Sequence, residues 1–147
     1  MKTTPEEYDK KVSIISPKSK IVKNIFFAFL SGGTICTIGQ ILLNIYLNFG
    51  LEKKQANTWV TVTLIFLGGF LTSLKIYDNI AKYAGAGTIL PVTGFANSMV
   101  SPAMEFKTEG HVLGLGAKMF LISGPVIVFS VVSSVIYGIF IYVFKLY

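Results

Sequence analysis

Polar side chains inside apolar stretches are the residues of this chain that could do chemistry. Gln40 and Asn44 lie in an uncharged run, whereas Thr93, Asn97 and Ser98 lie in a second apolar stretch that glycines and prolines interrupt. In both stretches two polar residues are four positions apart, which places them on one face of a helix. Such a face can line a polar pathway through a membrane or hydrogen-bond to a neighbouring helix, and the sequence leaves both uses open.

Pro91 and Gly94 indicate that the second stretch contains the start of a short helix, which could attract an anion. Proline is favoured in the first turn of a helix, so a short helix is predicted to begin at Pro91 and to carry Thr93 and Asn97 one turn apart. The first turn of a helix presents free amides and the positive end of the helix dipole, which attract anions. A charged cluster of Glu105, Lys107 and Glu109 follows. It fits either a solvated loop or the charged mouth of a pore.

The sequence contains no residue pattern that supports catalysis or cofactor binding. The sequence has no G-x-S-x-G, no phosphate-binding G-x-x-x-x-G-K-[ST] and no H-E-x-x-H, and His111 is its single histidine. Cys36 is the only cysteine, so neither a disulfide framework nor a cysteine metal site can form within one chain. We therefore expect no catalytic residue, no metal site and no cofactor, and we do not expect an enzyme.

The elements that hold these residues are strongly apolar. Of 147 residues, 52% are hydrophobic and 14% are charged, whereas soluble domains carry about 25% charged residues. Runs at about 24–47, 58–77 and 119–144 are predicted to be transmembrane helices, because about 20 apolar residues cross a hydrocarbon core of ~30 Å. Trp59 and Tyr77 are expected to mark the ends of the second helix. Gly124-Pro125 predicts a bend in the third helix or a point of helix entry.

The central segment at about 84–104 does not fit one continuous helix. It contains Gly85, Gly87, Pro91, Gly94 and Pro102, and the backbone groups freed at such breaks find no water within a bilayer. Re-entrant half-helices, shielded by neighbouring helices, would solve this problem. A second and weaker candidate of this kind is 111–120. The predicted fold is an all-α integral membrane protein, with a polar, lysine-rich cytoplasmic segment at 1–23 and a single membrane domain at 24–147.

Lysine supplies all the positive charge behind the net charge of +6. Six of the thirteen lysines precede the first predicted span, as expected of a cytoplasmic flank, and the absence of arginine argues against a nucleic-acid partner. A re-entrant central segment places ten lysines inside and three outside, whereas a full crossing places nine inside and four outside. The lysine distribution favours the re-entrant topology only slightly, and the full crossing remains open.

Small residues four positions apart allow helices to approach closely. Such pairs occur within all three predicted spans, at Ala28/Gly32, Gly69/Ser73 and Ser134/Gly138. They predict packing within the chain or against other subunits.

The chain resembles the stage V sporulation protein AC family of endospore-forming bacteria nearly end to end. The resemblance rests on Thr4-Pro-Glu-Glu-Tyr8, Gly32-Gly-Thr-Ile-Cys-Thr-Ile-Gly-Gln40, Ala84-Gly-Ala-Gly-Thr88, Pro91-Val-Thr-Gly-Phe-Ala-Asn-Ser98 and Gly124-Pro-Val-Ile127. The sister AE family of the EB type is similar across the glycine-rich centre, but it would lack the N-terminal Thr-Pro-Glu-Glu-Tyr extension. That extension favours the AC family.

The resemblance implies a channel or transporter subunit that moves dipicolinic acid, as calcium dipicolinate, into the developing spore and out during germination. It also implies the AD and AE types of stage V A proteins as partners, and a place in the forespore membrane that becomes the spore inner membrane. Two other functions remain open. One is a scaffold that anchors a soluble partner, and the other is a tension-gated pore for small solutes.

Overall fold

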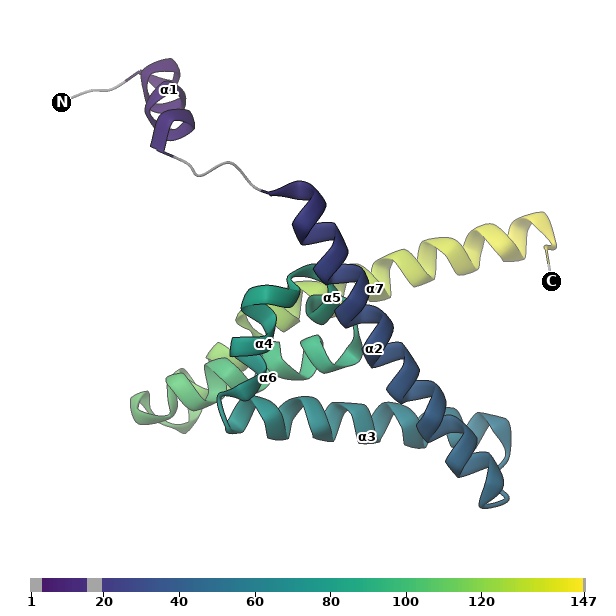
Figure 1. Cartoon of the computed structure of the whole chain (residues 1–147). Helices are drawn as coiled ribbons and strands as arrows, with labels where there is room; N and C mark the ends of the chain where they lie inside the picture. The colour runs from purple at the N-terminus through teal and green to yellow at the C-terminus, as the bar shows by residue number, and fades with distance from the viewer. Residues whose placement is uncertain (1–3, 16–19, 147) are drawn as a thin grey trace.

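The computed structural model describes residues 4–15 and 20–146, and all regular elements within them are helical. Helix α1 (Pro5–Ile15) buries none of its residues and stands apart from the other helices (Figure 1). The expected N-terminal segment 1–23 comprises α1 and the first residues of α2, together with residues 1–3 and 16–19, which lie outside the described residues.

Within the described residues, three helices are long and apolar enough to cross a membrane. They are α2 (Ile21–Asn48), α3 (Lys53–Ser73) and α7 (Ala117–Phe144), and a π-helical turn, η2 (His111–Gly116), runs directly into α7. The predicted spans 24–47 and 119–144 lie within α2 and α7. The expectation that a helix begins at Gly124-Pro125 is wrong, because α7 begins at Ala117 and continues through Pro125.

The second predicted span ends earlier than its hydropathy indicated. Lys75 adopts a left-handed conformation with φ of 57°, which ends α3 and turns the chain into α4 (Ile76–Ala84). Tyr77 therefore lies on α4, where it is only 4% exposed. The expectation that Tyr77 marks an interfacial end of the span is wrong, because the turn at Lys75 carries its ring into the protein.

The central segment is broken into short helices, as its glycines and prolines indicated. Gly85, with φ of 53°, separates α4 from α5 (Ala86–Ile89), and the extended Pro91 caps the start of α6 (Val92–Glu105). A 3-10 turn, η1 (Lys107–Glu109), follows. The longest of these helices, α6, has 14 residues and spans about 21 Å, which is less than a hydrocarbon core of ~30 Å.

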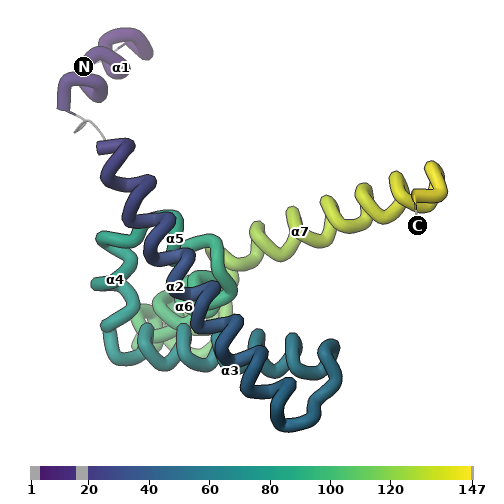
Figure 2. Tube along the Cα trace, turned by 45° about the vertical axis from the view of Figure 1, so that its right-hand side comes forward, coloured from purple at the N-terminus to yellow at the C-terminus, as the bar shows by residue number. Residues whose placement is uncertain are grey.

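The short helices pack against the long ones at glycines. Helix α6 lies along α3, and α5 lies against α2 (Figure 2). Gly87 of α5 approaches so closely that a Cβ atom there would collide with the Ala28 carbonyl oxygen and the Ser31 hydroxyl. A Cβ atom on Gly68 of α3 would lie 2.9 Å from the Cα of Thr93. Two of the predicted small-residue pairs, Ala28/Gly32 and Gly69/Ser73, thus lie at contacts within the chain. Gly32 contacts α5, and Gly69 contacts α6.

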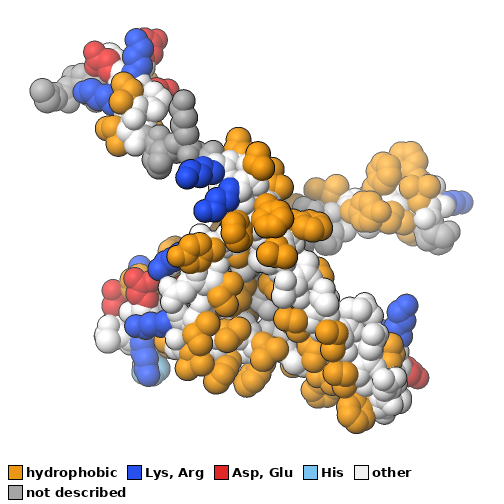
Figure 3. Space-filling model, in the orientation of Figure 1, with side chains coloured by type: hydrophobic (Ala, Val, Ile, Leu, Met, Phe, Trp, Pro, Cys, Tyr) orange, Lys and Arg blue, Asp and Glu red, His pale blue; other side chains and the backbone are white. Residues whose placement is uncertain are grey.

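The third pair, Ser134/Gly138, lies on the part of α7 that extends away from the other helices (Figure 2). From Val126 to Phe140 every residue of α7 is exposed. Hydrophobic side chains also cover much of the face that Figure 3 shows, and many large hydrophobic residues of α2 and α3 are exposed. An apolar surface of this extent is expected of a protein surrounded by lipid or by other membrane helices.

Gly68→Ala should destabilise the protein, because the new methyl group would meet the backbone of Thr93, which cannot move aside as a flexible side chain could. Overpacking of this kind costs about 1–3 kcal/mol. We expect the midpoint of thermal unfolding in detergent to fall by several degrees. The matched control is Gly138→Ala, where no atom lies within 4 Å of the added Cβ. Equal midpoints for the two variants would contradict the α3–α6 contact.

Candidate functional site

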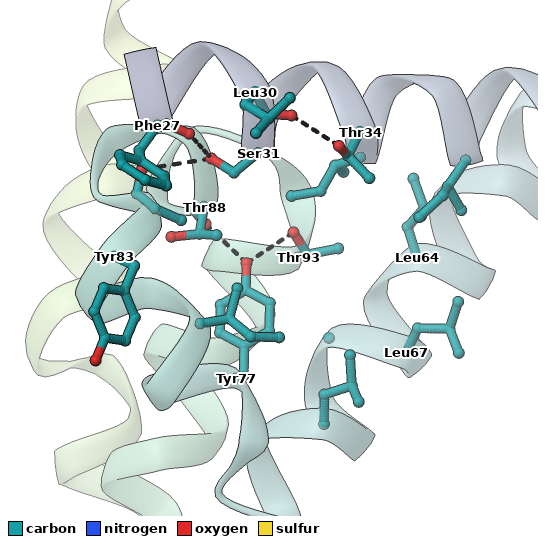
Figure 4. Close-up of a pocket in the computed structure, with 16 residues that line it drawn as sticks. Phe27, Leu30, Ser31, Thr34, Leu64, Leu67, Tyr77, Tyr83, Thr88 and Thr93 are labelled. Carbon is teal, nitrogen blue, oxygen red and sulfur yellow. Dashed lines mark hydrogen bonds between the residues drawn. The ribbon is translucent and has the colours of Figure 1, made fainter. Parts of the chain in front are cut away.

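A cavity of about 470 Å³ lies between α2, α3 and α4 (Figure 4). Most of its wall consists of aliphatic and aromatic side chains, among them Phe27, Leu64 and Leu67. Hydroxyl groups supply its polar side chains, and no charged side chain lines it. They belong to Ser31, Thr34, Tyr77, Tyr83, Thr88 and Thr93.

Tyr77 connects the broken segment to this cavity. Its hydroxyl lies 2.8 Å from the carbonyl oxygen of Thr88, to which it donates, and 2.9 Å from the hydroxyl of Thr93 (Figure 4). Thr88 and Thr93 stand on either side of the break at Pro91, and both are almost fully buried. A single side chain from α4 therefore hydrogen-bonds to both ends of the break between α5 and α6.

A second polar contact lies one helical turn further along the interface of α3 and α6. The Thr72 hydroxyl is 2.9 Å from Oδ1 of Asn97 and 2.7 Å from the carbonyl oxygen of Gly68, one turn back on its own helix. Gly68 is the residue that contacts Thr93. The two contacts form one continuous row, which we call the polar seam: Thr72, Tyr77, Thr88, Thr93 and Asn97.

At one end of the polar seam lies a cleft of about 590 Å³ that is lined by charged residues. Thr72 belongs to both features. The Lys82 ammonium group donates to Oδ1 of Asn79 at 3.3 Å. We call this feature the charged cleft, and it is lined by Thr72, Lys75, Asp78, Asn79, Lys82, Ser101, Met104 and Glu105.

Three of the residues predicted from sequence lie in these features. Thr93 and Asn97 belong to the polar seam, on one face of α6 as their spacing predicted, and Glu105 lines the charged cleft. The hydroxyl of Ser98 donates to the carbonyl oxygen of Phe95, one turn back on the same helix, at 2.8 Å.

The start of α6 is closely packed. A Cβ atom on Gly94 would collide with the carbonyl oxygens of Thr88 and Ile89, so the first turn of α6 lies directly against the end of α5. Pro91 is the capping residue before this turn. The amides of Gly94 and Phe95 donate to the carbonyl oxygen of Pro91, at 2.9 and 3.4 Å, so they are paired within the turn itself.

Other predicted residues lie away from the seam. Gln40 and Asn44 are exposed on α2, where the Gln40 amide donates to Oδ1 of Asn44 at 3.0 Å. Lys107 is exposed on η1, beyond the end of α6. The structure therefore does not bring these three residues together with Thr93 and Asn97.

Sequence reasoning missed Thr72, Tyr77 and Thr88. Threonine within a helix commonly hydrogen-bonds to a carbonyl of its own preceding turn, as Thr72 does with Gly68, so its type and position carry no signal of a second partner. Lys75 and Lys82 could have been identified from the sequence. They are seven positions apart, which places them on one face of a helix, and they flank the polar pair Asp78 and Asn79.

The charged cleft brings the lysines Lys75 and Lys82 together with the carboxylates of Asp78 and Glu105. No three His, Cys, Asp or Glu side chains gather in a way that could hold a metal ion within residues 4–15 and 20–146.

Comparisons with known proteins identify related membrane proteins. The family described as SpoVAC/SpoVAEB sporulation membrane protein matches residues 24–140. Stage V sporulation protein AC of Bacillus subtilis (strain 168) is 47% identical over 146 residues, which cover 99% of this chain and 97% of that protein. No solved structure matches the chain.

Tyr77→Phe should destabilise the protein, because it leaves the Thr88 carbonyl and the Thr93 hydroxyl buried without the tyrosine hydroxyl. An unsatisfied buried polar group costs about 1–3 kcal/mol. We expect a lower midpoint of thermal unfolding in detergent. Tyr83→Phe, on the same helix but 75% exposed, is the control and should leave the midpoint unchanged. If both variants behaved alike, the bonds of Tyr77 would not hold the break together.

Proposed function

The chain belongs to the SpoVAC/SpoVAEB family of sporulation membrane proteins, and from this premise we propose that it is a subunit of a channel or transporter for dipicolinic acid. The solute moves as calcium dipicolinate into the developing spore and leaves during germination. The complex lies in the forespore membrane, which becomes the spore inner membrane, and includes the AD and AE types of stage V A proteins.

The observation that carries this proposal is the position of the polar seam. It runs along the interface of α3 and α6, from the charged cleft at Thr72 to the cavity at Thr93. Broken helices that are buried among neighbours are a common way to place polar groups at membrane depth. In our proposal α4, α5 and α6 form the re-entrant segment, and the seam marks the route of the solute.

The charged cleft suits a chelated dianion. Lys75 and Lys82 offer positive charge to carboxylate oxygens, and the amide of Asn79 offers hydrogen bonds. Asp78 and Glu105 line the same cleft, and carboxylate oxygens are the ligands that calcium prefers. A surface with both signs of charge can hold a neutral metal chelate without repelling either of its ends.

The seam of one chain is closed in this arrangement. Thr72 is 2% exposed and Thr93 is 6% exposed, and the cavity beyond them is lined mostly by apolar side chains. Apolar constrictions hold back ions because they exclude water. In our proposal an open route forms when the seam separates, and the other stage V A proteins complete its wall.

Lys75→Gln combined with Lys82→Gln should lower the dipicolinate content of spores several-fold, because the cleft loses the positive charge that attracts the anion. The assay measures dipicolinate in spores that produce the variant in place of the native protein, with the protein level checked by immunoblot. The control is Lys53→Gln with Lys54→Gln, which removes two exposed charges at the start of α3. Equal losses in both variants would argue for general charge effects and against the cleft.

Single cysteines at Thr93, Asn97 and Ser98 in a Cys36→Ser background test the route itself. If the seam opens in the assembled complex, a membrane-impermeant thiol reagent should label Thr93→Cys and Asn97→Cys, and dipicolinate should slow the labelling. Ser98→Cys, whose parent hydroxyl bonds within α6, reports how far the opening extends. Absent labelling together with normal dipicolinate content would favour the scaffold function, in which the N-terminal segment 1–23 and the loop at 105–118 bind a soluble partner.

A further inference from the structure

Helix α2 has two different faces. One face contacts α3 and α5, through residues such as Gly39 and Gly32. The opposite face is exposed along the helix, and its members recur every three or four residues, so they form one straight surface. We call it the outer face of α2, and it comprises Phe26, Phe29, Gly33, Thr37, Gln40 and Asn44.

The outer face carries hydrogen-bonding groups at membrane depth. Gln40 and Asn44 lie within the uncharged run from 24 to 47. Their mutual bond of 3.0 Å uses one N–H of Gln40 and one lone pair of Asn44. The other N–H of Gln40, its carbonyl oxygen and the amino group of Asn44 remain available. Lipid chains cannot hydrogen-bond to them, so these groups call for a partner from another polypeptide.

The outer face also permits close approach. No atom lies within 4 Å of a Cβ placed on Gly33. Beside Gly33, a hollow of about 460 Å³ lies between α2 and α5 and is lined in part by Phe29, Cys36 and Leu90. A small residue that is flanked by a hollow allows two membrane helices to come into backbone contact.

We propose that the outer face of α2 binds the same face of a second copy of this chain. Two copies inserted in the same orientation hold Gln40 and Asn44 at the same depth, so each amide meets an amide. Primary amides carry both donors and acceptors, which makes the face complementary to itself about a two-fold axis. No charged residue lies between 24 and 47, so no like charges within the span oppose the pairing.

Cys36 makes the proposal testable with the native chain. It is exposed, lies one helical turn from both Gly33 and Gln40 and so borders the outer face, and it is the only cysteine in the sequence. Oxidation of native membranes with copper phenanthroline should produce a disulfide-linked species of twice the chain mass. The double variant Gln40→Leu, Asn44→Leu should reduce that species several-fold, and it should still insert because leucine is more apolar than either amide.

The matched control moves the cysteine around the same helix. Ile45→Cys in a Cys36→Ser background places an exposed cysteine next to Asn44 in sequence but off the outer face, and it should cross-link several-fold less than Cys36. Equal cross-linking at both positions, no change with the leucine variants, no dimer, or a cross-linked product of another mass would each overturn pairing with a second copy. The test requires no transport, so its outcome is independent of the proposed function.

Discussion

Hydrocarbon offers no hydrogen-bond partner to a peptide group, and this constraint governs how the centre of the chain folds. The breaks at Gly85 and Pro91 leave backbone groups that a continuous helix would satisfy. The Tyr77 hydroxyl bonds to one of them, the carbonyl of Thr88. Tyr77 reaches this break because the left-handed turn at Lys75 brings α4 back beside α5.

Burying the broken segment also determines where glycine is needed. In lipid, helices associate through van der Waals contact and hydrogen bonds, because apolar side chains gain nothing by leaving one apolar surrounding for another. Backbone contact at Gly68 and Gly87 provides that association for α6 and α5. The contact at Gly68 also brings Thr93 and Asn97 within reach of Tyr77 and Thr72. Packing and polar seam are therefore two aspects of one interface.

Sequence predicted the parts of this fold that depend on long uniform runs. Helices α2 and α7 were found from uncharged stretches, and the breaks from glycine and proline, because those residues act locally. The end of α3 was misplaced, because hydropathy does not register that Lys75 adopts a left-handed conformation. Spacing placed Thr93 and Asn97 on one face, but their partners Tyr77 and Thr72 depend on how separate helices meet, which no local pattern encodes.

The amide side chains of the polar seam and of the outer face of α2 differ in their hydrogen-bond partners. Asn97 accepts a hydrogen bond from Thr72 inside the chain, whereas Gln40 and Asn44 bond only to each other in the described structure and face outwards. Polar groups at membrane depth persist only where they find partners or serve a function. The buried polar side-chain atoms of the seam all have partners within the described chain, and any opening must exchange these internal bonds for bonds to a solute or to water. In our proposals the outer face of α2 pairs with another chain and the seam opens along α6, so the two events use different side chains and do not compete.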